Sequence, residues 1–157
     1  MVRIKALACA ALAAGAVMAS AAPTAQAAAP VPFSITENID FNSEDPPTFT
    51  ATGPLCPSGT FEDDVRVAGG ANSPLPKVNL LIRTVYTCAD GSGTFFVLKH
   101  VFITFDEETE TSTNTGPITL NGGTGDYSRL RGHGVDSGST DEFGIGVGEI
   151  TGVIVRQ

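Results

Sequence analysis

Two neighbouring segments rich in β-branched and aromatic residues constrain the fold of this chain most strongly. They run from Val78 to Cys88 and from Thr94 to Phe105, and the short segment between them contains two glycines. Such spacing between two apolar runs is typical of a β-hairpin. The 18 Gly and 10 Pro residues of the chain also disfavour long helices, because both residues weaken helix interiors. The sequence therefore predicts an all-β fold.

Further strands are indicated by alternation of apolar and polar residues. Phe33, Ile35, Ile39 and Phe41 fall on one face of an extended segment, with Glu37 at the remaining position of that face. No stretch of ten or more residues after the N-terminal region shows a clean helical period. The count of about eight short strands predicts a closed barrel or a sandwich. The other expected strands cover residues 48–53, 60–67, 117–120, 127–135 and 142–155.

The N-terminal residues have the pattern of a secretory signal peptide. Arg3 and Lys5 precede an Ala-rich apolar run over residues 6–22, and the small residues Ala25 and Ala27 suit a cleavage site. A single membrane anchor is the alternative, although an Ala-dominated run is a weak spanning segment. We therefore expect a signal peptide over residues 1–27 and one secreted, extracellular domain over residues 28–157.

Charge and cysteine content narrow the partners of that domain. Seven basic and 17 acidic residues remain after residue 27, a net charge of −10, which repels phosphate backbones and argues against nucleic-acid binding. No membrane association is expected after processing. Cys56 and Cys88 are the cysteines of the domain and predict a disulfide in an oxidising compartment, with two buried thiols or a metal pair as the alternatives.

No residue pattern predicts a cofactor or a metal site. His100 and His133 have no metal-ligand spacing, and the acidic turn at residues 106–110 fits no calcium loop. A nucleophile constellation of the kind found in hydrolases is also absent from the sequence, which ranks an exported hydrolase below the other functions.

A barrel that holds a small apolar molecule needs a few polar groups in its lumen. Five residues are candidates because each interrupts an apolar stretch: Glu37, Arg83, Tyr86, His100 and Glu149. Arg83 could instead lie on the polar outer face, and His100 could be a strand residue without a catalytic role. As a general acid or base, His100 would suit a pH near neutral.

The second arm of the hairpin carries bulky residues on both faces. Phe95 and Val97 represent the odd positions, and Phe96, Leu98 and Phe102 represent the even ones. A strand with one solvent face would alternate cleanly, so we expect both faces to be buried. One face would line the barrel interior and the other would contact another segment or another subunit. The sequence thus indicates a possible homo-oligomer.

A glycine-rich segment follows and favours a tight turn over a ligand site. It lacks the third glycine and the βαβ unit of a dinucleotide loop, and it occurs once, unlike calcium-binding repeats. Glycine reaches the positive φ angles of such a turn without steric cost. The residues of this structural motif are Gly122, Gly123, Thr124, Gly125, Tyr127, Arg131 and Gly132.

The run from Gly122 to Gly132, GGTGDYSRLRG, resembles the GGTG-x-aromatic-x-x-A-R-G signature of the dirigent proteins and is similar to their barrel relatives, the allene oxide cyclases. Residues 88–95 resemble uncharacterised secreted bacterial members of the same broad group. The firm similarity covers residues 116–136, with Leu130 where Ala is usual. The resemblance implies an eight-stranded antiparallel barrel, often trimeric, with an apolar cavity. It also implies that the glycine turn is structural, with Arg131 bracing it through a carboxylate such as Asp126.

These observations lead to two functional hypotheses. In the first, the secreted barrel binds a small apolar ligand in its lumen and guides its cyclisation or isomerisation by shape, without a cofactor. In the second, the protein is a non-enzymatic structural or interaction protein whose barrel is filled by Phe95, Phe102 and their neighbours. Polar candidates that point into an open lumen would favour the first hypothesis, and a packed lumen would favour the second.

Overall fold

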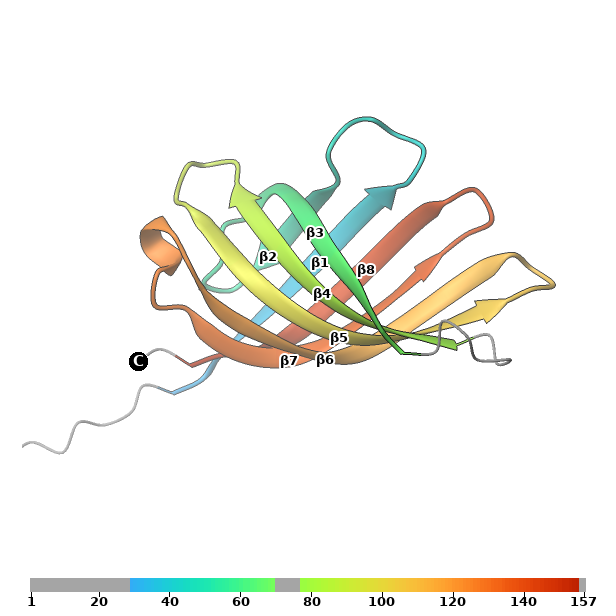
Figure 1. The fold of residues 1–157 in the computed structure, drawn as a ribbon. Helices are drawn as coiled ribbons and strands as arrows, with labels where there is room; N and C mark the ends of the chain where they lie inside the picture. Colours follow the sequence, from blue (N-terminus) through green and yellow to red (C-terminus); the bar gives the residue numbers. More distant parts are fainter. Residues whose placement is uncertain (1–28, 70–76, 156–157) are drawn as a thin grey trace, which may run out of the picture.

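The computed structural model describes residues 29–69 and 77–155, so the expected signal peptide lies outside the described residues. The described residues form a closed barrel of antiparallel strands in sequential order, as predicted (Figure 1). One short 3-10 helix, η1, interrupts this order between β6 and β7. The elements are β1 (Val31–Asp40), β2 (Thr48–Thr52), β3 (Ser58–Gly69), β4 (Lys77–Cys88), β5 (Thr94–Asp106), β6 (Thr111–Gly123), η1 (Gly125–Tyr127), β7 (Arg131–Thr140) and β8 (Ile145–Ile154).

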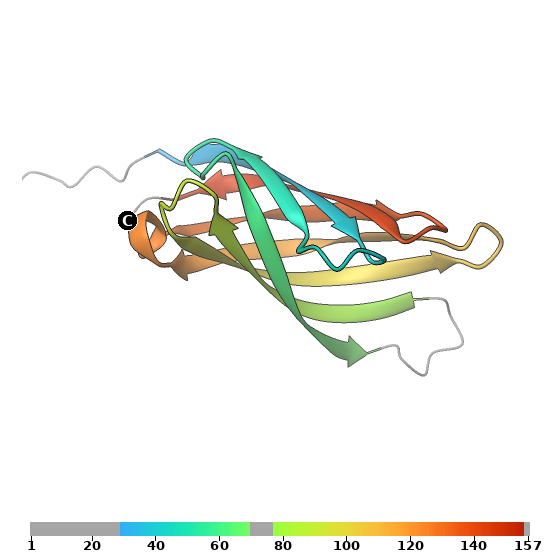
Figure 2. The ribbon, with the colours of Figure 1, turned by 90° about the horizontal axis from the view of Figure 1, so that it is seen from above.

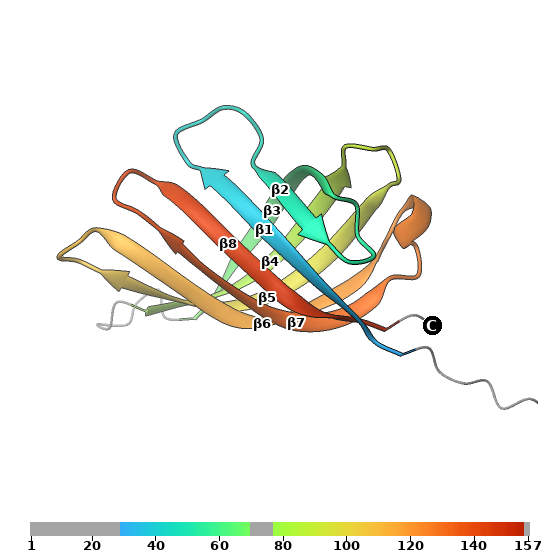
Figure 3. The same cartoon turned by 180° about the vertical axis from the view of Figure 1, so that it is seen from behind.

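The first and last strands close the barrel. β1 pairs with β8 along its whole length, from Val31 opposite Ile154 to Asp40 opposite Ile145. The other edge of β1 pairs with the short strand β2, so β1 lies between β2 and β8 (Figure 3). This closure leaves no free sheet edge between the first and last strands.

Alternation along each strand decides which side chains enter the lumen. In β5 the odd residues Phe95, Val97 and Val101 are buried, whereas Leu98 and Phe102 are exposed. The odd face of the second hairpin arm therefore lines the interior, whereas the sequence predicts only that one of the two faces does so. Within the described residues, no segment of the chain covers the even face, so the expected burial of that face by the chain itself is not observed.

The two ends of the barrel differ. The β4–β5 turn and η1 lie at one end, near the C-terminal end of the chain, and the β5–β6 turn lies at the opposite end (Figures 1 and 2). We call the end with the β4–β5 turn and η1 the closed end, and the end with the β5–β6 turn the open end. The packing that distinguishes them is described below. The described residues include no helix that is long and apolar enough to cross a membrane.

Among the strand starts, those of β6 and β7 differ most from the expected ones. β6 begins at Thr111 rather than at residue 117, and its inward residues near the open end, Ser112 and Asn114, are polar. β7 begins at Arg131, because Tyr127 belongs to η1. The start of β6 is not predicted because its lumen-facing residues are polar and do not alternate with apolar ones. The start of β7 lies later than expected because the glycine turn occupies the residues before it.

Candidate functional site

Tightly packed apolar side chains fill the lumen at the closed end. Phe49, Phe61 and Phe95 surround Tyr86, whose ring stacks on Phe95 at a centroid distance of 4.6 Å. Tyr127 of η1 packs against Phe95 from the end of the barrel, at 5.4 Å between ring centroids. This half therefore resembles the filled barrel of the second hypothesis, although Phe102 takes no part because it lies outside and is 49% exposed.

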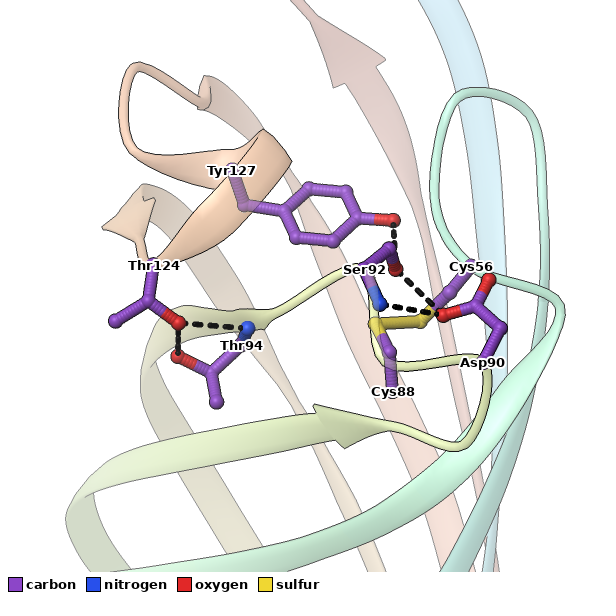
Figure 4. The surroundings of a disulfide bond; sticks show 7 residues. All are labelled: Cys56, Cys88, Asp90, Ser92, Thr94, Thr124 and Tyr127. Carbon is purple, nitrogen blue, oxygen red and sulfur yellow. Dashed lines mark hydrogen bonds between the residues drawn. A yellow bond between two sulfur atoms is a disulfide. The ribbon is translucent and has the colours of Figure 1, made fainter.

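The disulfide and the glycine motif close this end together (Figure 4). Cys56 and Cys88 are bonded, as predicted. The Thr124 hydroxyl accepts a hydrogen bond from the Thr94 amide at 3.1 Å, and the Tyr127 hydroxyl lies 3.3 Å from the Ser92 hydroxyl. Residues of the glycine motif thus contact the turn that follows Cys88.

Close backbone contact explains the glycine at position 125. Gly125 has a φ of +56°, and a Cβ atom there would lie 2.2 Å from the carbonyl oxygen of Ser92. The expected brace between Arg131 and Asp126 is not found among the described residues. Arg131 instead donates a hydrogen bond from Nη1 to the Leu130 carbonyl at 2.8 Å, because its exposed side chain lies back along the turn.

The lumen is open in the other half of the barrel. A cavity of about 680 Å³ lies there, within the size range of small-molecule sites. Most of its wall is apolar, because inward positions of successive strands carry aliphatic side chains. β1, β3, β4 and β5 contribute the aliphatic wall residues Ile39, Val65, Leu80, Ile82, Val101 and Ile103.

A buried charged cluster forms the floor of this cavity, where the open half meets the packed half. Lys99 of β5 places its Nζ atom 2.5 Å from Oε1 of Glu37 on β1 and 3.9 Å from Oδ1 of Asp136 on β7. All three residues are at most 5% exposed. The ammonium therefore lies between two carboxylates from β1 and β7, the two strands that flank β8 in the barrel wall.

Neighbouring polar groups hold these carboxylates in place. Tyr86 donates a hydrogen bond from its hydroxyl to Oε1 of Glu37, the oxygen that Lys99 also contacts. Asn114 donates from Nδ2 to Oδ2 of Asp136 at 2.5 Å. Because donors from β4 and β6 hold both carboxylates, the polar groups of the floor are fixed in position.

Asp63 on β3 adds a third carboxylate to the floor. Thr84, which is fully buried on β4, donates a hydrogen bond to Oδ1 of Asp63 at 2.6 Å. Asp63 itself keeps contact with solvent, unlike Glu37 and Asp136. Asp63 therefore lies on the solvent-exposed side of the charged floor.

Two glycines make room for the cluster. A Cβ atom at Gly148 of β8 would lie 2.6 Å from Oε2 of Glu37, and one at Gly138 of β7 would lie 2.6 Å from Oδ1 of Asn114. Side chains at these inward positions would occupy the space of the buried polar groups. The glycines of β7 and β8 thus permit polar side chains from the facing strands to enter the lumen.

Burial shifts the acid–base properties of the floor. It raises the pKa of Asp136 to about 6, although the Lys99 ammonium opposes this shift, and the Glu37 carboxylate adds to it. Burial also raises the pKa of Asp63, again against the effect of Lys99. The pKa of Tyr86 lies well above its usual range, because of burial and then the Glu37 charge. Asp136 can therefore exchange a proton near neutral pH, whereas the Tyr86 hydroxyl remains protonated.

The structure divides the five candidate ligand-binding residues. Glu37 and Tyr86 point into the barrel and contact each other. Arg83 and Glu149 are exposed, and His100, on the outward face of β5, packs against Phe102 at 5.1 Å between ring centroids. Arg83, His100 and Glu149 therefore do not line the lumen, and Arg83 takes the alternative position on the outer face.

Strand alternation explains these three outward positions. Arg83 differs in parity from the inward Tyr86, and its guanidinium lies 4.5 Å from the ring centroid of the outward Phe96. His100 differs in parity from the inward Val97 and Val101. The same rule places Glu149 outside, next to the inward Ile150.

Three charged floor residues, Lys99, Asp63 and Asp136, are not among the candidates predicted from the sequence. Lys99 shares the odd face of β5 with Val97 and Val101, so its parity was a usable signal. Asp136 lies in a Gly- and Ser-rich strand whose neighbouring apolar residue, Val135, points outward, and no apolar alternation marks its inward position. Asp63 lies in a run of polar residues, so no apolar alternation marks its inward position either. Within the described residues, no group of three or more His, Cys, Asp or Glu residues is placed to hold a metal ion.

The fold and the site together define a class: a closed, eight-stranded antiparallel β-barrel whose lumen is packed at one end and forms a polar-floored cavity at the other. In comparisons with known proteins, no family model, no curated protein and no solved structure matches this chain. The resemblance of the glycine motif to the dirigent and allene oxide cyclase group therefore stays a prediction, and the function is inferred from the lumen.

Proposed function

We propose that this protein binds a small, mostly apolar molecule in the open half of its lumen. The observation that supports this function most directly is the cavity of about 680 Å³, with an aliphatic wall and a buried polar floor. Sites of this kind bury the apolar part of a ligand against the wall and orient it through a few polar groups. Here Glu37, Lys99 and Asp136 are those groups.

Binding of the neutral fluorophore Nile red to the purified, oxidised protein tests this proposal. Val101 is buried in the lumen, and its neighbour Phe102 lies outside. We expect Val101→Trp to fill the cavity and weaken binding at least about tenfold, because the ligand loses its apolar contacts. Phe102→Ser is the matched control and leaves binding unchanged. Ile103→Trp is a second filling variant, and circular dichroism shows whether each variant folds.

Equal binding by wild type and both folded filling variants would contradict a lumen site. Loss of binding in Phe102→Ser alone would instead place the fluorophore on the outer face of β5. These two results are distinguishable because the two side chains lie on opposite faces of the same strand.

We also propose that the lumen guides a bound molecule to cyclise or isomerise, the activity implied by the resemblance to allene oxide cyclases and dirigent proteins. Two features support this extension. The closed wall limits the water around a bound molecule, and the carboxyl of Asp136, with its pKa raised to about 6, can donate a proton and accept one back in a step without net change.

Native mass spectrometry of protein purified from its host identifies a retained molecule, and its isomers can then be followed with and without protein. We expect Asp136→Asn to bind that molecule but to slow its conversion at least about 100-fold. Undiminished conversion by this variant would rule out Asp136 as the proton carrier.

We propose export for the compartment and a second copy of the chain for the partner. The disulfide supports an oxidising compartment. Leu81, Leu98 and Phe102 form an exposed apolar face on β4 and β5. Apart from Asp106 at the end of β5, no acidic residue occupies the outward positions of β4, β5 or β6, so two molecules of net negative charge can meet there with little repulsion. Native mass spectrometry tests this pairing, and Phe102→Glu is expected to yield monomers.

A further inference from the structure

Charge is unevenly distributed around the cavity. Among the described residues that line it, seven are acidic and one, Lys99, is basic. Glu37, Asp63 and Asp136 share the single ammonium of Lys99 at the floor. Asp106 and Glu110 belong to the acidic residues at the open end. Because apolar walls concentrate the field of such charges, the cavity attracts a positive charge and repels a negative one.

The floor also contains carboxylate oxygens that accept no hydrogen bond from the described residues. Among the described residues, the hydrogen bonds to Glu37 end on Oε1 and the one to Asp136 ends on Oδ2. The second oxygen of each carboxylate accepts none. Both residues line the cavity, and Lys99 Nζ lies 3.9 Å from Asp136 Oδ1, beyond hydrogen-bond distance. Glu37 Oε2 and Asp136 Oδ1 are therefore floor oxygens that can accept a further hydrogen bond.

We propose that the ligand of this lumen is an amine: a mainly apolar molecule with one ammonium group, which binds the free carboxylate oxygens of Glu37 and Asp136 while its hydrocarbon part contacts the aliphatic wall. This inference rests on the proposed function and specifies the class of ligand. An ammonium donates hydrogen bonds to carboxylates, which a neutral or anionic head group does not do as well. The floor holds three carboxylates and one ammonium, that of Lys99. The ammonium of the ligand would add a second positive charge to balance them.

Three probes with the same chain and different head groups test the proposal: decylamine, decanol and decanoate. Isothermal titration calorimetry of the oxidised protein at about pH 8 keeps the amine cationic and Asp136 ionised. We expect decylamine to bind at least about tenfold more tightly than decanol, because hydrogen bonds to charged groups are stronger, and decanoate to bind most weakly. Lowering the pH to about 5 should loosen decylamine several-fold without affecting decanol, because Asp136 takes up a proton.

Two variants locate the ammonium. Asp136→Asn and Glu37→Gln keep the shape of each side chain and remove its charge, and each should reduce the preference for decylamine over decanol. Glu149→Gln, which removes an exposed carboxylate on the outside of β8, is the matched control and should retain that preference. Asp136→Asn also keeps the test valid if Glu37→Gln does not fold.

The outcomes separate this inference from the proposed function. Binding of decanol or decanoate as tightly as decylamine, with competition against Nile red, would overturn the amine assignment but leave the lumen site intact. Failure of all three probes to bind, together with Nile red binding that the filling variants Val101→Trp and Ile103→Trp leave unchanged, would overturn both. A preference for decylamine that survives both floor variants would place the ammonium elsewhere and also overturn the assignment.

Discussion

Lys99 Nζ lies 2.5 Å from Glu37 Oε1 in the middle of the barrel, although the two residues are 62 positions apart in the chain. Both side chains are 4% exposed, so water contributes little to the solvation of either charge. A buried pair of this kind stabilises the fold only while both partners are present, because each compensates the desolvation of the other.

Lys99→Met should therefore destabilise the protein strongly. Removal of the ammonium leaves Glu37 and Asp136 buried without a counter-charge, and we expect a loss of about 3–5 kcal/mol in the free energy of unfolding. Arg83→Met, which removes an exposed cation from the outer face of β4, is the control and should cost about 1 kcal/mol or less. Urea denaturation measures both values, and equal losses would show that the buried pair has no special role.

The raised pKa of Asp136 makes stability depend on pH. Its folded value of about 6 exceeds the usual value of about 3.9, so the folded protein holds this proton more tightly than the unfolded chain. The contribution of Asp136 to stability is therefore full below about pH 4 and is lost as the pH rises through about 6. Asp136→Asn should flatten that part of the stability profile, measured by urea denaturation. A profile as steep as that of wild type would contradict the shift.

The disulfide should contribute substantially to stability. Cys56 and Cys88 are 32 positions apart, and closing a loop of this length stabilises a fold by about 3–4 kcal/mol through the unfolded chain. Dithiothreitol should lower the melting temperature of wild type accordingly. The double variant Cys56→Ser, Cys88→Ser should melt at the lower temperature with or without reductant. A reductant effect in that variant would point to another cause.

Gly148→Ala tests whether the floor needs the space above β8. The new methyl group would meet Oε2 of Glu37, whose carboxylate is held by Lys99 and Tyr86 and cannot move away freely. We expect a loss of about 1–3 kcal/mol by thermal or urea unfolding, in the range of overpacked cores. Gly69→Ala, where no atom lies within 4 Å of the new methyl group, is the control. Similar values for both variants would refute the steric argument.

Processing of the N-terminus can be checked directly. The expected signal peptide predicts that intact-mass measurement of protein from the host's culture medium finds a chain that begins near Ala28. A full-length chain retained with the cells would favour the membrane-anchor alternative.

The strands of the central hairpin could be predicted because their buried faces are apolar. Val97 and Val101 mark the inward parity of β5, and Tyr86 marks that of β4. The same parity places Lys99 inside and Arg83 outside, because the direction of a strand side chain depends on its position rather than on its residue type. β6 was predicted too short because Ser112 and Asn114 line an open lumen rather than an apolar core.

The floor could be predicted only in part, because its members come from different strands. Glu37 interrupts an apolar face and was identified, but its contact with Lys99 depends on how the barrel closes. Asp136 lies among small residues that leave no pattern in the sequence. Register across the closed sheet, from β1 through β8, brings these charges together, and a single strand does not encode it.

One half of the barrel is packed and the other is open. The ends of the strands in the packed half therefore stabilise the fold, and the opposite ends of the same strands line the cavity. Leu80, Ile82 and Ile103 can be exchanged to reshape the lumen, while the aromatic cluster and the disulfide at the far end keep the scaffold intact. A family of barrels with altered ligand choice could thus be engineered from this chain without redesigning its folding core.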